Sequence, residues 1–403
     1  MKSVLYISYD GLTDSLGQSQ ILPYLIGLKV KGNKVSILTC EKPDNYKKNK
    51  SIVQQKCEEH DIDWNYTMYS NKYPIISPFL NTGRLRKRAE EIFNSNSFNI
   101  VHCRSIIPAQ IGFRLCKNSK AKLIFDIRGF WANERVDGGI WDLSNPIYWT
   151  VYQYFKNSEK QLFRDAESIV TLTENAKNYI KDNFENQGNF TVVPCCADTS
   201  HFDINRIDLG KVNQLKSKFN IPESHYVLTY IGSLGARYKL SEMLDFFKVL
   251  QAKVPNSTFL FISKSDTSKI TDLAHSKGIK RDSIKITSCE YSEIPTYISM
   301  ANASIFFIVS SFSGKAVSPI KQAEVLSLGL PIIANTGLGD TDKILLETNI
   351  GIVVEDFKKA DYEMAVNRIL EFKRSKEEIR AEALKLFTVE MGIDRYHKLY
   401  QSL

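Results

Sequence analysis

The sequence lacks the cysteine and histidine patterns that mark disulfide scaffolds and zinc sites. Its seven cysteines are scattered and contain no CxxC pair, which is typical of reduced thiols in a cytoplasmic protein. The six histidines form no HExxH or similar cluster, so the sequence predicts no zinc site. We therefore expect no metal and an activity that survives a chelator.

Long apolar runs and a strong charge excess are missing as well. No apolar run approaches the roughly 18 residues that a membrane span needs, and the opening Met1–Asp10 is too short and too quickly acidic for a signal peptide. The net charge of +8 is modest for 403 residues and is spread over both halves. This argues against a dedicated nucleic-acid domain, and we expect a cytoplasmic protein.

Two segments could make a weak contact with the inner face of a membrane. The basic cluster Arg84–Arg88 could touch anionic lipid, and its alternative is a solvated helix face. The aromatic stretch 148–155 could rest on a membrane interface, and its alternative is the domain core. Peripheral association is therefore a further expectation.

Nucleotide motifs with a fixed glycine spacing are also absent. The first apolar run leads into a loop that contains Gly11 and Gly17, but this loop is neither GxGxxG nor a P-loop. A nicotinamide dinucleotide site is therefore poorly supported. The two glycines still allow the backbone to come close to a ligand.

What the chain does contain is a regular alternation of strand-like apolar runs and amphipathic helical stretches, typical of parallel α/β units. We predict strands at 4–8, 34–39, 100–103, 123–127, 168–171, 191–194, 226–231, 258–262, 284–286, 304–309, 332–334 and 352–354. We predict helices at 19–31, 209–219, 240–253 and 376–403. The length suits two domains, and doubly wound domains bind ligands at the carboxyl ends of their strands.

A short helix of about ten residues is marked at both ends between Ser318 and Pro331. Ser318 can be its N-cap, and Pro319 fits the first helical position, where a missing N–H costs nothing. Gly329 suits the left-handed residue that follows a helix, and Pro331 prevents its continuation. The helix follows the predicted strand 304–309.

Two charges share one face near the start of this helix, because Lys321 and Glu324 lie three residues apart. A loop that runs from a strand into a helix N-terminus attracts anions through its free N–H groups and the helix dipole. A cation for phosphate beside a carboxylate for sugar hydroxyls suits a nucleotide-sugar diphosphate. The alternative is a buried helix with two solvated charges.

A basic loop follows the predicted strand 226–231. It begins with the small residues Gly232 and Ser233 and continues to Arg237 and Lys239. Arginine offers a planar fork and lysine a point charge to a diphosphate. An ordinary basic loop is the alternative, and the nearby Lys321 helix favours phosphate.

In the first half, polar residues follow two predicted strands. Asp126, Arg128 and Glu134 lie near two aromatic residues and could contact a sugar. His102 also lies at the end of a predicted strand. Its role could be in packing or in catalysis.

Together these segments are similar to the retaining glycosyltransferases of family 4, which have the α/β GT-B fold of two Rossmann-like, doubly wound domains that face a central cleft. The resemblance covers nearly the whole chain and rests on segments 11–20, 128–134, 193–202, 232–239 and 318–331. It implies an acceptor-side domain at 1–200 and a nucleotide-sugar-binding domain at 201–385. A final helix at 386–403 would cross back to the first domain.

The resemblance also implies roles for single residues. Glu324 would bind the ribose of the nucleotide. Arg237 and Lys321 would neutralise the diphosphate, and Asp126 and Arg128 would face the sugar or acceptor. Arg237, Lys321, Asp126 and Arg128 are the catalytic candidates.

The remaining candidates would complete the binding of the donor. Gly11 and Gly17 would let the first loop approach the phosphate and the acceptor. Four further candidates lie around the diphosphate, namely Gly232, Ser233, Lys239 and Ser318. The donor itself is a substrate, so no cofactor is implied.

The chain departs from the family pattern at three positions. The family often has two glutamates eight positions apart, and the first of them is Ala316 here. The usual arginine of the second-half loop is Ser233, and the usual lysine is Tyr238. Arg237 and Lys239 could take over these contacts.

The resemblance predicts sugar transfer, with retained configuration, from a nucleotide-diphosphate sugar to a glycan or lipid-linked acceptor in polysaccharide or lipopolysaccharide synthesis. UDP is the first expectation for the nucleotide and GDP the second. The alternatives are a nucleotide-sugar 2-epimerase, which would convert the donor without an acceptor, and a non-catalytic partner protein that binds the nucleotide without turnover.

Overall fold

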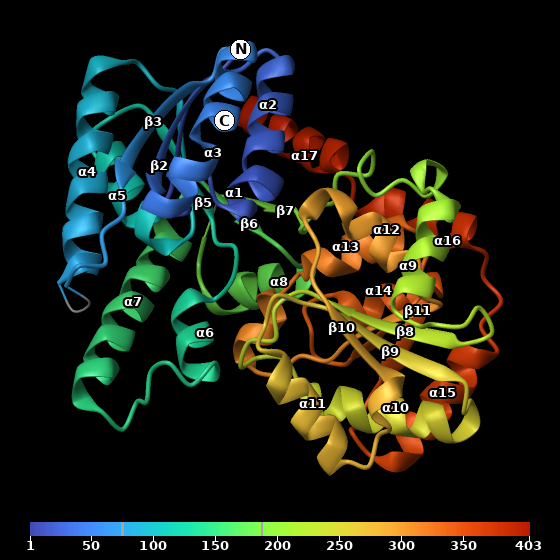
Figure 1. Cartoon of the computed structure of the whole chain (residues 1–403). Coiled ribbons are helices and arrows are strands. Elements are labelled where there is room, and N and C mark those ends of the chain that lie inside the picture. Colours follow the sequence, from blue (N-terminus) through green and yellow to red (C-terminus); the bar gives the residue numbers. More distant parts are fainter. Residues whose placement is uncertain (74–75, 187) are drawn as a thin grey trace. The chain divides into compact units, whose positions relative to one another are not determined.

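The computed structural model describes residues 1–73, 76–186 and 188–403, and within them the strands form two separate parallel sheets (Figure 1). The chain divides into two compact units. Unit 1 contains Met1–Cys195 and Val389–Leu403, and unit 2 contains Cys196–Thr388. The predicted α/β class with doubly wound parallel sheets is confirmed.

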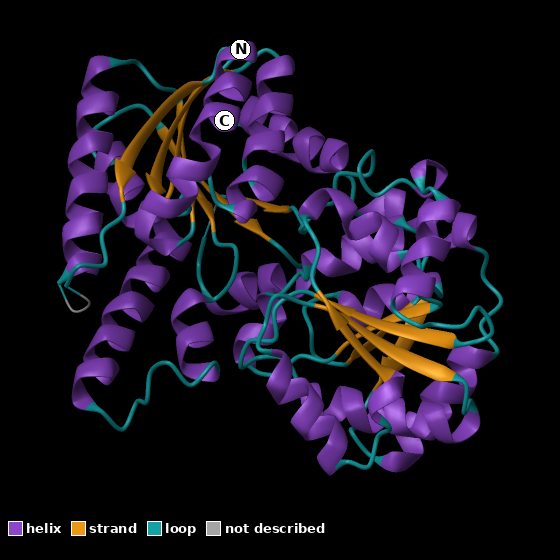
Figure 2. Cartoon of the chain, viewed as in Figure 1, coloured by secondary structure: helices purple, strands orange, loops and turns teal. Residues whose placement is uncertain are grey.

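Unit 1 is built on a seven-stranded sheet in the order β3-β2-β1-β4-β5-β6-β7. Its strands are β1 (Ser3–Ser8), β2 (Lys34–Glu41), β3 (Asp63–Met68), β4 (Ile100–Arg104), β5 (Lys122–Asp126), β6 (Ser168–Thr171) and β7 (Asn189–Val192). Its helices are α1 (Ser15–Gln20), α2 (Leu22–Val30), α3 (Pro43–Glu59), α4 (Ser77–Ser95), α5 (Ile106–Cys116), α6 (Trp131–Asp137), α7 (Pro146–Asp165), α8 (Glu174–Asn183) and α17 (Val389–Ser402). Helices cover both faces of the sheet (Figure 2), so its central strands β1 and β4 are buried along nearly their whole length.

Unit 2 has a six-stranded parallel sheet in the order β10-β9-β8-β11-β12-β13. Its strands are β8 (Tyr226–Ile231), β9 (Ser257–Ile262), β10 (Ile284–Thr287), β11 (Ala303–Phe306), β12 (Ile332–Asn335) and β13 (Gly351–Val354). Its α-helices are α9 (Leu209–Lys218), α10 (Leu240–Lys253), α11 (Thr267–Ser276), α12 (Ile294–Ile298), α13 (Ile320–Ser327), α14 (Thr341–Thr348), α15 (Lys359–Leu370) and α16 (Lys376–Leu386). The strand order reverses between β8 and β11, so the loops after these strands diverge and leave room for a ligand.

Two predicted helices are each divided in the structure. The stretch predicted as one helix at 19–31 belongs to α1 and α2, which are separated at Ile21 with φ −126°. The predicted helix 376–403 is α16 and α17, and Thr388 between them forms a parallel bridge with Ala197. This break is where the chain leaves unit 2 and returns to unit 1.

The aromatic stretch of α7 is not core along its whole length. Leu162 and Phe163 near its end are buried, but Tyr148, Trp149 and Tyr154 are exposed. The core interpretation is therefore wrong for the first half of α7. In the part of the chain that the structure describes, no helix is both long and apolar enough to span a membrane.

Candidate functional site

Helix α13 begins one residue later than the sequence suggested. Pro319 is the N-cap with φ −69° and ψ 121°, and Ile320 is the first helical residue. The prediction of Ser318 as N-cap is therefore wrong, because the extended ψ of Pro319 keeps it outside the helix. The other end is as predicted, since Gly329 has φ +70° after the helix.

Lys321 in the first turn of α13 is buried between two tyrosines. Its Nζ lies 4.2 Å from the ring centroid of Tyr230 and 4.1 Å from that of Tyr238. Among the described residues, this Nζ has no hydrogen-bond partner. Cation–π contacts compensate only part of the hydration that an ammonium loses. The site therefore holds a desolvated cation that an anionic ligand would stabilise.

Glu324, one turn further on, is buried with Lys321. Burial lowers the pKa of Lys321 to about 7, and the nearby Glu324 opposes this change. Burial also raises the pKa of Glu324 to about 7, with Lys321 opposing. Both side chains thus change charge easily near neutral pH, which is typical of functional sites.

The glycine at the end of β8 makes room for Lys321. A Cβ at position 232 would lie 3.2 Å from Lys321 Nζ, and Gly232 has φ +108°, which favours glycine. The neighbouring Ser233 accepts a hydrogen bond at its carbonyl oxygen from the Tyr230 hydroxyl at 2.8 Å. The structure thus brings Gly232, Ser233 and Lys321 together at one strand end.

The two basic residues of the loop have different surroundings. Arg237 donates from Nη2 to Ser313 Oγ at 3.3 Å, so it lies against η4 (Phe312–Ala316), the segment that precedes α13. Lys239 pairs with Glu242 and lies 4.5 Å from the ring centroid of Phe357. Arg237 is therefore the better placed cation of the two, because the charge of Lys239 is already balanced.

In unit 1, close packing within the protein requires glycine at both positions of the first loop. A Cβ at Gly11 would lie 2.5 Å from Glu41 Oε2, and one at Gly17 would lie 2.0 Å from the Gly11 carbonyl oxygen. The buried Glu41 accepts from the backbone N–H of Leu12 at 2.7 Å and of Thr13 at 3.0 Å. The loop is thus held by a carboxylate on β2.

Asp126 and Arg128 belong to a buried cluster at the ends of β4 and β5. Asp126 accepts from the Tyr396 hydroxyl at 2.7 Å and lies 3.7 Å from Arg128 Nη1. His102 joins the cluster, with Nε2 at 3.5 Å from Asp126 and Nδ1 at 2.7 Å from the Tyr400 hydroxyl. Since Tyr396 and Tyr400 lie on α17, the cluster attaches this helix to the sheet.

Sequence reasoning missed several residues that shape these sites. Tyr230 is the last residue but one of the mostly apolar strand β8, so nothing marked it as a contact of Lys321. Glu41 follows the predicted strand 34–39, where a lone acidic residue resembles any loop residue. Tyr396 and Tyr400 could have been noticed as a pair with helical i,i+4 spacing on the final helix.

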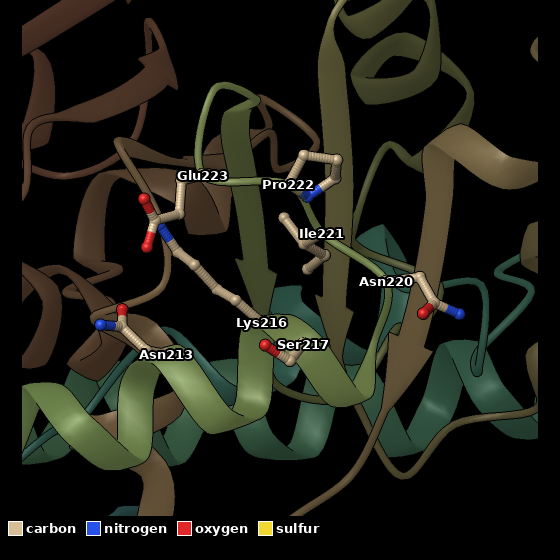
Figure 3. Close-up of a pocket in the computed structure, with 7 residues that line it drawn as sticks. All are labelled: Asn213, Lys216, Ser217, Asn220, Ile221, Pro222 and Glu223. Atoms are coloured by element: carbon tan, nitrogen blue, oxygen red, sulfur yellow. The ribbon is translucent and has the colours of Figure 1, made fainter.

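A cavity of about 400 Å³ opens elsewhere in unit 2, where α9 ends before β8 (Figure 3). It contains none of the predicted site residues, and two of the seven side chains drawn in Figure 3, Lys216 and Glu223, carry opposite charges. Its lining residues are Asn213, Lys216, Ser217, Asn220, Ile221, Pro222 and Glu223. The strand-end site around Lys321 therefore remains the candidate.

Two α/β units, each built on a parallel doubly wound sheet, define a GT-B-type architecture. Residues 25–201 match the family model for Glycosyltransferase Family 4, and residues 211–386 match that for Glycosyl transferases group 1. The chain therefore belongs to the glycosyltransferase family that these two models describe.

One curated relative and several solved structures are similar to the chain. An uncharacterised glycosyltransferase of Methanocaldococcus jannaschii is 21% identical over 268 residues, covering 62% of this chain and 62% of that protein. The match thus spans less than two thirds of this relative. A glycosyltransferase structure from Rickettsia africae covers 100% of this chain and 98% of its own, with 14% identity and a TM-score of 0.71. A structure of HepE from Anabaena, in complex with UDP and glucose, covers 100% of both chains, with 11% identity and a TM-score of 0.69.

Proposed function

We propose that this glycosyltransferase transfers a hexosyl group from a UDP-sugar, with a GDP-sugar as the second choice, to a glycan or lipid-linked acceptor. The reaction would retain the anomeric configuration and serve polysaccharide or lipopolysaccharide synthesis. The observation that carries the proposal is the desolvated ammonium of Lys321, which lies beside Gly232 at the end of β8. Neighbours of the same fold support the choice of donor, since HepE has been solved with UDP-glucose.

Departure of the nucleotide is the step that needs these side chains. Negative charge builds up on the diphosphate oxygens as the bond to the sugar breaks, and preorganised cations stabilise it. Lys321 and Arg237 supply the positive charge, while Glu324 accepts hydrogen bonds from ribose hydroxyls. Gly232, Ser233 and Ser318 give the diphosphate access to backbone at the strand ends. The proposal includes no metal, so turnover should persist in a chelator.

The first test is a thermal-shift panel with UDP, GDP, CMP and ADP on the wild type and on Glu324→Ala. Binding to the folded state alone raises the melting temperature by mass action. We expect a base-specific rise that Glu324→Ala loses and that the control Glu347→Ala keeps, since Glu347 is exposed on α14. No shift with any nucleotide would contradict the proposed site.

Retention is tested separately, by assigning the anomeric configuration of donor and product by NMR. An inverted product would reject a retaining mechanism while leaving the nucleotide site intact.

A non-catalytic partner protein is the second candidate, motivated by two of the three positions at which the chain departs from the family pattern. Ala316 is buried where the family has a glutamate, and Ser233 replaces an arginine. This candidate predicts a nucleotide-dependent thermal shift without release of nucleotide from any sugar donor. Conversion of the donor without an acceptor would instead indicate the epimerase.

A further inference from the structure

The start of α4 exposes apolar side chains. Ile76, Phe79 and Leu80 are all more than half exposed, and Phe79 reaches 75%. Leu85 and Ala89, on the opposite side of the same helix, are buried in the core. The first turns of α4 therefore present an apolar surface that unit 1 does not need for its own packing.

The next turns of the same helix are basic. All four basic side chains of the segment 84–88 are exposed, while Leu85 anchors the helix. Arg86 and Arg88 lie 3.8 Å and 3.0 Å from the carboxylates of Glu90 and Glu91. The four basic residues outnumber these two acids, so the surface keeps a net positive charge next to the apolar turns.

The start of α7 repeats the apolar feature. Its first ten positions, 146–155, contain no charged residue. Ile147 is 71% exposed, and Trp149 and Tyr154 are each more than half exposed. Tryptophan and tyrosine combine an apolar ring with one polar atom, which suits a boundary between water and lipid.

The two helices begin on the same side of unit 1. Helices α4 and α7 both pack against α5. In Figure 1 both begin at the side of unit 1 where the arrowheads of β2 and β3 point. One flat partner could therefore contact both starts at the same time.

We propose that the starts of α4 and α7 form a docking surface for an anionic lipid bilayer. The apolar side chains would enter the boundary between headgroups and acyl chains, while the basic turns of α4 would contact lipid phosphates. A second copy of this chain fits less well, because it carries the same net charge of +8. The inference rests on the proposed function in one respect, since it places the enzyme where a lipid-linked acceptor would lie.

Co-sedimentation with phosphatidylglycerol–phosphatidylcholine vesicles tests the docking surface. We expect at least tenfold weaker binding for Phe79→Ser/Leu80→Ser and for Ile147→Ser/Trp149→Ser. Arg86→Gln/Lys87→Gln should lower binding and its salt dependence together, since exposed charges are screened by salt. The tryptophan fluorescence of the wild type should shift to the blue with anionic vesicles and not with phosphatidylcholine alone, and Ile147→Ser/Trp149→Ser, which lacks one of the four tryptophans, should lose this shift.

The matched controls lie in unit 2. Leu346→Ser/Leu370→Ser removes two exposed apolar residues, and Lys343→Gln/Lys359→Gln removes two exposed charges. Both should bind vesicles like the wild type. The inference is overturned if the wild type does not prefer anionic vesicles, if the α4 and α7 variants bind normally, or if those variants instead abolish a dimer in sedimentation equilibrium. The UDP thermal shift of each sample reports the proposed function separately.

Discussion

The two units bury charge in different ways. In unit 1, burial alone would raise the pKa of Asp126, but Arg128 and His102 outweigh it and lower that pKa to about 2. In unit 2, burial dominates, and the pKa values of Lys321 and Glu324 both move to about 7. Asp126 is thus paired with Arg128 and accepts a hydrogen bond at Oδ2, although its Oδ1 has no hydrogen-bond partner, whereas Lys321 Nζ lacks a hydrogen-bond partner among the described residues. The comparison separates a charge that is paired within the fold from one that a ligand would neutralise under the proposed function.

The largest expected effect is the loss of the charge that holds unit 1. Asp126→Ala leaves Arg128 buried without its carboxylate and removes the acceptor of Tyr396, which should cost about 3–5 kcal/mol of unfolding free energy. Urea denaturation measures the loss. The exposed control Glu90→Ala on α4 should change stability by less than about 0.5 kcal/mol. Equal stability of both variants would show that Asp126 has no structural role.

The next effect concerns the cations of unit 2. Arg237→Ala and Lys321→Ala should each lower turnover by about 10²–10³, the usual cost of losing a preorganised donor at a developing anion. Circular dichroism should stay unchanged, because neither residue anchors a strand. Lys343→Ala on the exposed face of α14 is the control. Wild-type rates in both variants would be incompatible with the assignment.

A smaller effect tests how α17 is attached. Tyr396→Phe removes the hydroxyl that donates to Asp126 and leaves the carboxylate buried, at a cost of about 1–3 kcal/mol. The matched control is Tyr154→Phe, at an exposed position of α7. Both are measured by urea unfolding, and a Tyr396→Phe protein as stable as its control would show that the hydrogen bond contributes nothing.

The smallest effect is a pH dependence of donor binding, which we expect from Lys321 in unit 2. A bound diphosphate favours the charged form of Lys321, whose pKa is about 7 in the free protein. Above pH 7 binding must therefore take up a proton, and affinity should fall by up to about tenfold per pH unit. Calorimetry with a UDP-sugar in two buffers of different ionisation enthalpy measures this uptake, because the diphosphate has no proton to lose there. Affinity that is flat from pH 7 to 9 would disprove the coupling.

The sequence predicted the parallel sheets well because most residues of their central strands are apolar. The strands 168–171 and 226–231 were predicted at their exact bounds. It missed β3, whose residues Asp63–Met68 mix polar and apolar side chains because β3 lies at the edge of the sheet. The break at Ile21 was marked by Pro23, which lies in the first turn of α2 and which the prediction of one helix over 19–31 disregarded.

The site was only partly predictable, for a physical reason. Local spacing places Lys321 and Glu324 on one helix face, because the helix repeat is fixed. The rings that surround Lys321 come from β8 and the loop after it, and such contacts depend on tertiary packing. For the same reason the sequence offered Asp126 as a sugar contact, whereas the structure buries it beneath α17.

The return of α17 to unit 1 has a consequence for how the chain is made. Unit 2 is one continuous segment, but unit 1 needs residues 389–403 to supply Tyr396 and Tyr400. On the ribosome, residues 1–195 emerge long before these tyrosines, so Asp126 and His102 must wait for their hydroxyl partners on α17. The second unit can therefore complete its fold first, and the unit that is translated first is the last to be finished.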